Sequence, residues 1–174
     1  MLIVFRYGHR AFRDIRVTTH CALVSRVFGA DKLVYYGQRD DSFEKSLQKT
    51  VGQWGGKFKV EYAEDFVDYL TKKKEEGFKI VHLTMFGVNL PDFEPYFKKL
   101  RKEKKILIFV GAEKVPGEVY KIADYNVAVG NQPHSEIAAL AVFLDRLQEG
   151  KELKKKYPGA KTKIKNGFRN TLKE

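Results

Sequence analysis

Apolar runs alternate along the chain with segments in which apolar residues return at helical spacing. Six apolar or aromatic runs lie at residues 2–7, 32–37, 57–63, 79–87, 105–112 and 125–130. Helix-like segments follow them at residues 18–30, 42–54, 64–77, 92–104, 115–124 and 135–150. Parallel neighbours need a crossover of about a dozen residues, so this order predicts a mostly parallel sheet with helices on both faces. The predicted fold class is α/β.

Local capping residues set the expected ends of the first two helices. Thr18 or Thr19 is expected to cap the first helix, and Gly29 to end it in a left-handed conformation. Asp41 or Ser42 is expected to open the second helix for the same reason. No internal repeat or low-complexity tract interrupts the chain, so one compact core is expected in its 174 residues.

Composition narrows the class of protein. Hydrophobic residues make up 43% and charged residues 32%, which is typical of a folded chain with a well-solvated surface. No run of apolar residues is long enough to span a membrane, and the N-terminal one is too short for a signal peptide. We therefore expect a cytoplasmic protein with no membrane partner. The single cysteine, Cys21, excludes an internal disulfide and a cysteine-ligated zinc cluster, and we expect it inside a packed helix.

Positive charge is concentrated at one end of the chain. Residues 151–174 hold nine Lys or Arg against two Glu, a net charge of +7 out of the total of +11. Such a segment attracts phosphates in a salt-dependent way, so RNA or DNA is the leading partner class. A merely solubilising tail is the alternative. We accordingly divide the chain into a domain at residues 1–150 and a basic C-terminal extension at residues 151–174.

Three predicted loops combine glycine with small polar groups directly after an apolar strand. They are residues 83–87, 110–117 and 129–136. In open parallel sheets ligands bind outside the carboxyl ends of the strands, so a ligand is expected at these loops. The sequence has no P-loop, no dinucleotide-binding glycine fingerprint, no nucleophile elbow and no zinc-protease histidine spacing. Nucleotide hydrolysis and hydride transfer therefore lose support.

Four stretches carry a family resemblance, namely HLTMFG at 82–87, GAEKVP at 111–116, GNQPHSE at 130–136 and RYGHRAFRDIRVTTHCALVSRVFGAD at 6–31. Over residues 1–150 the chain resembles the archaeal tRNA (cytidine-56) ribose 2'-O-methyltransferases of the SPOUT class. The resemblance implies S-adenosylmethionine as methyl donor and the 2'-hydroxyl of cytidine 56 in the tRNA T loop as acceptor. It also implies a homodimer and a C-terminal trefoil knot, a topology that periodicity alone would never predict.

By the same resemblance, the loops after the last strands wrap the S-adenosylmethionine and contact it through main-chain groups. The residues expected to bind it are Leu83, Thr84, Gly111, Ala112, Glu113, Lys114, Val115, Ala128, Val129, Gly130, Asn131, Gln132, Pro133, His134 and Ser135. The apolar helix that follows is expected to pack against both the knot and a second subunit.

Related ribose methyltransferases use an arginine from an N-terminal motif, which here implies Arg16 or Arg26. The family pattern has asparagine six positions before its arginine, and His20 stands there relative to Arg26, so Arg16 is slightly favoured. A phosphate contact or a surface ion pair is the alternative for either arginine. Glu113 matches a motif glutamate that would hold its loop or orient an arginine. His134 is a candidate base, because imidazole takes up protons near neutral pH.

Substrate RNA is expected to contact Arg6, Arg10 and Arg13 together with the basic extension, since phosphate contacts position RNA without specifying its sequence. Two other functions stay open. A catalytically inactive RNA-binding module on the same fold would keep the basic surface and lose the donor pocket. A small-molecule α/β enzyme would leave the charged tail unexplained.

Overall fold

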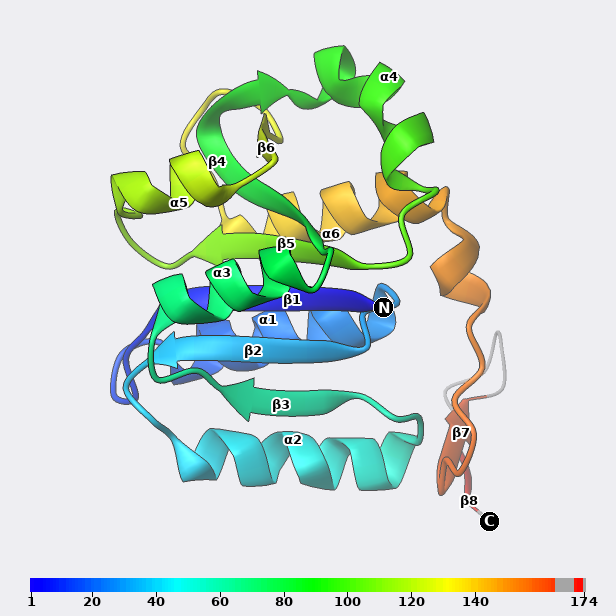
Figure 1. Ribbon diagram of the computed structural model, residues 1–174. Helices are drawn as coiled ribbons and strands as arrows, with labels where there is room; N and C mark the ends of the chain where they lie inside the picture. Colours follow the sequence, from blue (N-terminus) through cyan, green and yellow to red (C-terminus); the bar gives the residue numbers. More distant parts are fainter. Residues whose placement is uncertain (165–170, 174) are drawn as a thin grey trace.

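A six-stranded parallel sheet forms the centre of the computed structural model, which describes residues 1–164 and 171–173. The strand order is β3-β2-β1-β5-β4-β6, and every neighbouring pair is parallel. The strands are β1 (Leu2–His9), β2 (Lys32–Gly37), β3 (Lys59–Tyr62), β4 (Lys79–Asn89), β5 (Ile106–Gly111) and β6 (Tyr125–Ala128). The predicted α/β class and the mostly parallel sheet are confirmed (Figure 1).

Among the described residues, six α-helices cover the two faces of the sheet. They are α1 (Ile15–Val27), α2 (Asp41–Trp54), α3 (Phe66–Glu75), α4 (Leu90–Leu100), α5 (Gly117–Ile122) and α6 (Glu136–Gln148). Buried side chains of α1, α2, α4 and α6 join one hydrophobic cluster, and those of α3 and α5 join a second on the opposite face. Successive side chains of β1 point to opposite faces of the sheet, so Val4 packs in the first cluster while Ile3 and Phe5 pack in the second.

The two clusters account for most of the core. Complete burial of a Leu, Ile, Val or Phe side chain stabilises the fold by about 1.5–3 kcal/mol relative to exposure. Cys21 lies in the first cluster with no exposed surface, and burial raises the pKa of its thiol to about 12. The expectation that Cys21 lies inside a packed helix is therefore confirmed.

The start of α1 differs from the prediction. The helix begins at Ile15 with Asp14 as its N-cap, so neither Thr18 nor Thr19 caps it. Thr18 lies one turn inside, where its hydroxyl is 2.8 Å from Nδ1 of His9 at the end of β1. A tertiary contact therefore uses the side chain that local sequence assigned to a cap.

The other predicted helix ends were nearly right. Gly29 follows the last turn of α1 with φ +84° and closes the helix as predicted. Asp40 is the true N-cap of α2, one residue ahead of the prediction, and its Oδ1 accepts from the backbone N–H of Ser42 and Phe43 at 3.0 Å each. The shift arises because Asp40 has the extended backbone that an N-cap requires, while Asp41 and Ser42 are already part of the helix.

The chain changes faces at the far end of the sheet. Strand β6 pairs with β4 in two registers, Leu83 with Val127 and then Val88 with Val127, so β4 bulges between them. The α5 helix precedes β6 on one face and α6 follows it on the other. Residues 129–135 therefore cross from one side of the sheet to the other at its carboxyl-terminal edge (Figure 1).

The C-terminal residues run along the opposite, amino-terminal edge (Figure 1). They form the 3₁₀ helix η1 (Lys151–Lys154) and an antiparallel pair, β7 (Thr162–Ile164) with β8 (Thr171–Lys173). Residues 155–164 are tied to the body by backbone hydrogen bonds, from Gly56 N to Pro158 O at 2.9 Å and from Lys161 N to Gln53 O at 3.0 Å. Residues 165–170 and 174 of the predicted extension lie outside the described residues.

Within the described part of the chain, no helix combines the length and the apolar character that crossing a membrane requires.

Candidate active site

A cavity of about 600 Å³ opens at the carboxyl ends of β4, β5 and β6. Its size is within the usual range for small-molecule sites. Its walls come from the end of β4, the loop after β5, the loop after β6 and the first turns of α5 and α6. The lining residues are His82, Leu83, Thr84, Met85, Phe86, Gly111, Ala112, Glu113, Lys114, Val115, Gly117, Tyr120, Val129, Gln132, Pro133, His134, Glu136 and Ala139.

The cavity brings together all three loops that the sequence singled out. Eleven of the fifteen residues expected to bind the donor line it, and four do not: Ala128, Gly130, Asn131 and Ser135. Ala128 is fully buried in β6. The hydroxyl of Ser135 caps α6 by accepting from Ile137 N at 3.2 Å. These two residues therefore shape the wall from behind.

Side-chain amides join two of the walls to each other. Asn131 Nδ2 donates to the carbonyls of Met85 at 2.8 Å and Gly87 at 3.1 Å. Asn89 Oδ1 accepts from Gly130 N at 3.0 Å and also caps α4 through Leu90 N. The loop after β6 is thereby cross-linked to the distal half of β4, which fixes the position of Met85 in the lining.

Gly111 lies at a tight turn after β5. A Cβ atom built there would lie 2.4 Å from Cγ2 of Val115 and 3.1 Å from the carbonyl oxygen of Glu113. The loop folds back so closely that a larger residue would push Val115 from its place in the cavity wall. The glycine is therefore required by the close approach and not by an unusual backbone angle.

The inner wall of the cavity carries a hydrogen-bonded polar group. Thr84 Oγ1 lies 3.0 Å from the hydroxyl of Tyr120, whose ring packs edge-on against His82 with centroids 4.6 Å apart. Nδ1 of His82 lies 2.9 Å from Oδ1 of Asn126. Burial lowers the pKa of His82, so its imidazole is neutral at physiological pH and donates from Nδ1 to the amide oxygen.

Two carboxylates line the cavity, and each is paired with an arginine of the N-terminal segment. Glu136 Oε1 accepts from Nη2 of Arg6 at 2.9 Å, and Oε2 of Glu113 lies 3.5 Å from Nη1 of Arg10. Arg6 is 1% exposed, so it is out of reach of an RNA phosphate, contrary to the expectation from sequence. A guanidinium group thus balances the charge of each carboxylate, so these two pairs give the cavity wall no net negative charge.

His134 is an exposed lining residue with a defined hydrogen bond. Its Nδ1 lies 3.0 Å from the carbonyl oxygen of Ser135, which only accepts, so Nδ1 carries the proton. In the neutral ring Nε2 is then left as the proton acceptor.

The two candidate arginines lie at opposite ends of α1. Arg16 is exposed in the first turn, on the carboxyl-terminal edge of the sheet, though it is not among the lining residues. Arg26 is in the last turn, about 15 Å farther along the helix axis at a rise of about 1.5 Å per residue. Its Nη2 donates to the carbonyls of Trp54 and Gly55, and its guanidinium stacks 4.4 Å from the ring centroid of Tyr157. Arg26 therefore ties the C-terminal segment to the body.

Several lining residues were missed from the sequence. His82, Met85 and Phe86 belong to a stretch that the sequence did single out, so the motif itself carried a usable signal for them. Tyr120 and Glu136 come from helices, and only the three-dimensional packing turns them toward the loops.

Comparison with known proteins identifies close relatives. A family model described as tRNA ribose 2'-O-methyltransferase, aTrm56, matches residues 54–171. A Thermococcus kodakarensis protein named tRNA (cytidine(56)-2'-O)-methyltransferase is 52% identical, over 94% of this chain and 91% of its own. Proteins of the same name from Nitrosopumilus maritimus and Methanocaldococcus jannaschii are each 50% identical, over 92% of this chain and 89% of their own.

Solved structures share the fold at low sequence identity. The TrmH/SpoU tRNA modifying enzyme of A. aeolicus superimposes with a TM-score of 0.63 at 21% identity, over 87% of this chain and 75% of its own. The SpoU methyltransferase AviRb from Streptomyces viridochromogenes, solved in complex with AdoMet, has a TM-score of 0.56 at 13% identity, over 86% of this chain and 57% of its own.

Proposed function

The chain belongs to the tRNA ribose 2'-O-methyltransferase family aTrm56, and we propose on that basis that it methylates the 2'-hydroxyl of cytidine 56 in tRNA, with S-adenosylmethionine as donor. The observation that carries the proposal is the cavity, because the three loops of the family motifs line it together. An inactive RNA-binding module is not favoured, since it would have no reason to keep this space open between its loops.

The residues around the cavity suit S-adenosylmethionine. The lining is mostly apolar, which suits the adenosyl group. The main-chain groups of residues 111–115 and 129–134 would contact the adenine and ribose. When bound, S-adenosylmethionine supplies a methyl group that its sulfonium makes electrophilic.

The remaining predicted binding residues have a supporting role in this proposal. Asn131 and Gly130 hold the loop after β6 against β4, while Ala128 and Ser135 fix the two ends of that loop. Their loss would change the shape of the cavity rather than remove a direct contact.

The protein's contribution to the reaction is to align the ribose oxygen and to handle its proton. Alignment of reacting groups supplies several kcal/mol of the rate enhancement. We assign Arg16 to the developing negative charge on the ribose oxygen or to the adjacent phosphate, because it is exposed on the edge where the cavity opens. Nε2 of His134 or a water molecule accepts the hydroxyl proton. Arg26 keeps a structural role, since two carbonyls and Tyr157 already hold its guanidinium.

Assembly and location complete the proposal. The outward side of α6 carries an apolar stripe of Ile137, Ala138, Ala141 and Val142, which supports a homodimer with α6 at the interface. The crossing of residues 129–135 next to the distal part of β4 supports a trefoil knot in the segment 79–148. We also propose that the enzyme acts in the cytoplasm, and that residues 1–150 form the catalytic domain with residues 151–174 as a basic extension.

The decisive experiment uses labelled S-adenosylmethionine and an unmodified tRNA transcript, followed by mapping of the labelled nucleotide. Label is expected at cytidine 56 only, and none on a transcript with 2'-deoxycytidine at that position. Calorimetry with the donor alone should give a dissociation constant in the micromolar range, or about 8 kcal/mol. Donor binding without transfer to either RNA would contradict the proposed function.

A further inference from the structure

A fully exposed phenylalanine stands at the tip of the loop between β1 and α1. Phe12 has a relative exposure of 101%, the highest among the exposed apolar side chains of the described residues. An isolated exposed apolar residue is ordinary on a protein surface and proves nothing alone. Its surroundings make Phe12 informative, because the loop is anchored, basic and adjacent to the cavity.

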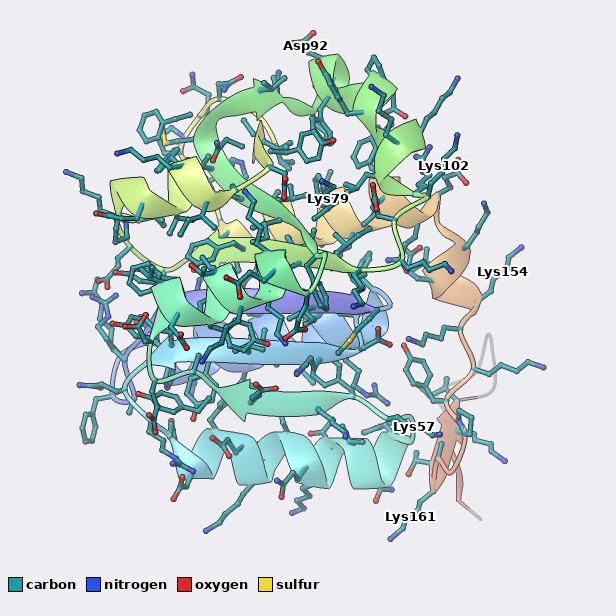
Figure 2. All side chains as sticks on the ribbon, viewed as in Figure 1. Lys57, Lys79, Asp92, Lys102, Lys154 and Lys161 are labelled. Carbon is teal, nitrogen blue, oxygen red and sulfur yellow. The ribbon has the colours of Figure 1, made fainter. Side chains whose placement is uncertain are left out.

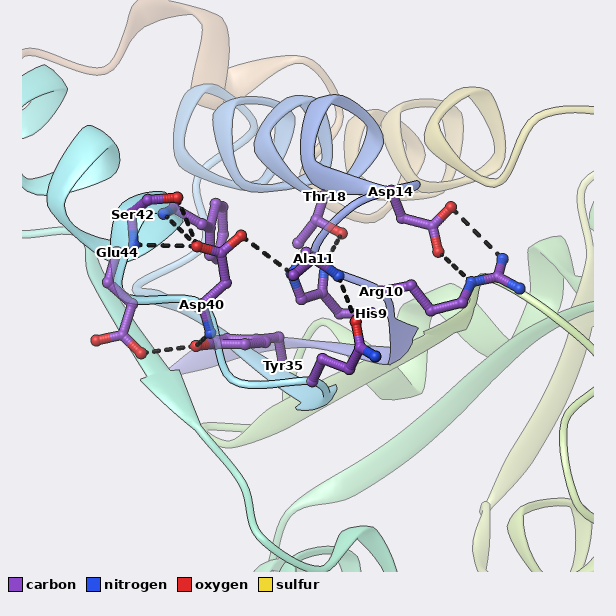
Figure 3. Close-up of polar contacts among 11 residues, drawn as sticks. His9, Arg10, Ala11, Asp14, Thr18, Tyr35, Asp40, Ser42 and Glu44 are labelled. Atoms are coloured by element: carbon purple, nitrogen blue, oxygen red, sulfur yellow. Dashed lines mark hydrogen bonds and ion pairs between the residues drawn. The ribbon is translucent and has the colours of Figure 1, made fainter.

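The stem of the loop is held by a network of polar contacts (Figure 3). Ala11 N donates to Oε1 of Gln38 at 2.8 Å, and Arg10 Nε donates to Oδ2 of Asp14 at 2.7 Å. Backbone N–H groups of Arg13 and Asp14 both donate to the carbonyl of Arg10, at 3.2 and 2.8 Å. Phe12 is therefore held out in solvent by a fixed turn.

The same network anchors the loop on the β1 side. His9 is 1% exposed, with Nδ1 2.8 Å from Thr18 Oγ1 and Nε2 3.5 Å from Oδ2 of Asp40. Asp40 in turn caps α2, so the stem is connected to two helices. A rigid support reduces the entropy lost when an exposed side chain binds a partner.

The loop stands beside the cavity. Nη1 of Arg10 lies 3.5 Å from Oε2 of Glu113, which lines the cavity, and a Cβ atom at Gly8 would lie 3.0 Å from the other carboxylate oxygen. Arg13 and Arg16, one and four residues after Phe12, are both exposed. An aromatic ring flanked by guanidinium groups is complementary to RNA, in which bases stack on aromatic faces and phosphates attract arginine.

We propose that Phe12 stacks on a base of tRNA next to the acceptor nucleotide, while Arg13 and Arg16 contact the flanking phosphates. This inference rests on the proposed function, because it assumes that tRNA enters at the cavity. Stacking of this kind is tolerant of base identity, so Phe12 contributes affinity and positioning and not the choice of nucleotide. The charge of the loop disfavours a second copy of the chain as occupant, since its own Arg13 and Arg16 would be repelled.

Kinetics test the proposal with a matched control. Phe12→Ala should raise KM for tRNA by roughly 5- to 150-fold, because loss of one base–aromatic stack weakens binding by such a factor. Affinity for S-adenosylmethionine should not change, and Phe12→Trp should restore KM. Val27→Ala is the control, since Val27 is a 43% exposed apolar residue at the far end of α1 and outside the basic extension. The salt dependence of KM should stay unchanged in Phe12→Ala and become shallower in Arg13→Ala.

Fluorescence reads the contact without methyl transfer. The chain has one tryptophan, so the double variant Trp54→Phe, Phe12→Trp carries a single indole at the loop tip. Addition of tRNA should quench its emission in a saturable way. If wild type methylates tRNA and Phe12→Ala does so with unchanged KM, the proposal is wrong while the proposed function stands. The stacking proposal would also be wrong if saturating tRNA did not quench the emission. It would be wrong too if light scattering found Phe12→Ala in a smaller assembly than wild type, because Phe12 would then contact a second copy of the chain.

Discussion

Gly87 is the position at which one methyl group should damage the cavity most clearly. It lies in the bulged part of β4, where a Cβ atom would be 2.5 Å from both Asn126 C and Val127 N and 2.6 Å from Asn126 O. All three atoms belong to the backbone of β6, so no side-chain rotation relieves the clash. In Gly87→Ala the two strands must separate by about 1 Å to reach ordinary contact distance.

The cost of this separation can be worked out from its parts. Overpacking of a tight contact costs about 1–3 kcal/mol, and rupture of the hydrogen bond from Asn131 to the Gly87 carbonyl adds about 0.5–1.5 kcal/mol. For a chain of this size each kcal/mol lowers Tm by about 2–4 °C, so a decrease of roughly 3–18 °C is expected. Met85 and Phe86 line the cavity beside this contact, so affinity for S-adenosylmethionine should fall as well.

Thermal unfolding and calorimetry measure the two effects. Gly52→Ala is the control, because Gly52 lies inside α2 with no atom within 4 Å of a built Cβ. Alanine should stabilise that helix by about 0.5–1 kcal/mol and leave donor affinity untouched. A Gly87→Ala protein with the Tm and donor affinity of wild type would refute the close approach of β4 and β6.

Four further predictions concern other parts of the molecule. Burial lowers the pKa of His9 and His82 below 6.5, so these histidines should not reduce the free energy of unfolding above pH 6.5. As the pH falls from 6.5 toward the folded-state pKa, the free energy of unfolding measured in denaturant should decrease, and the decrease should be shallower in His82→Gln. Because Arg26 holds Tyr157, Arg26→Gln should speed proteolysis within residues 151–164 and change kcat less than twofold. A large loss of kcat without faster proteolysis would indicate that Arg26 takes part in the reaction. Arg16→Ala should lower kcat about 100-fold with affinity for S-adenosylmethionine unchanged if Arg16 stabilises the ribose oxygen, whereas an equal kcat with a raised KM for tRNA would leave it the phosphate contact alone. Replacement of Lys154–Lys156 by Gln should reduce the slope of log KM for tRNA against log salt by about one for each phosphate that the tail no longer neutralises, whereas an unchanged slope would identify a solubilising tail.

The described part of the basic extension, residues 151–164, lies away from the cavity. Figure 2 places Lys57, Lys154 and Lys161 on the side of the molecule where the strands begin. Strand β1 has eight residues, so the two edges are about 26 Å apart at about 3.3 Å per residue. A tRNA that reaches both surfaces of one subunit must therefore extend across the sheet, and the lysines would contact a part of it remote from the acceptor ribose.

Much of the fold could be predicted because its determinants are local. Alternating strands and helices followed from apolar runs, and Gly29 ended α1 as its conformational freedom suggested. The start of α1 was misplaced because Thr18 bonds to His9, nine residues away, and no local rule signals that contact. The contact of Tyr157 with Arg26 spans 131 positions of sequence, and no local rule signals it either.

The site was predictable to the extent that the topology of parallel sheets dictates it. Carboxyl ends of neighbouring strands meet at one edge, which was enough to select the three loops. The pairing of Arg6 with Glu136 spans 130 positions, and a buried arginine in an apolar strand resembled an RNA contact by composition alone. Which loop side chains face inward also depended on packing, because Asn131 turns to the carbonyls of Met85 and Gly87 instead of the cavity.

The amide ties between β4 and the loop after β6 have a consequence for biosynthesis. The carbonyl of Met85 accepts a hydrogen bond from Asn131, which is synthesised 46 residues later. Asn89 likewise accepts from Gly130, 41 residues later in the chain. A nascent chain released before residue 131 would carry most of the sheet and yet lack a finished wall. The cavity can therefore bind S-adenosylmethionine only late in translation. A ligand that binds only when the loop after β6 is joined to β4 distinguishes full-length protein from prematurely terminated fragments.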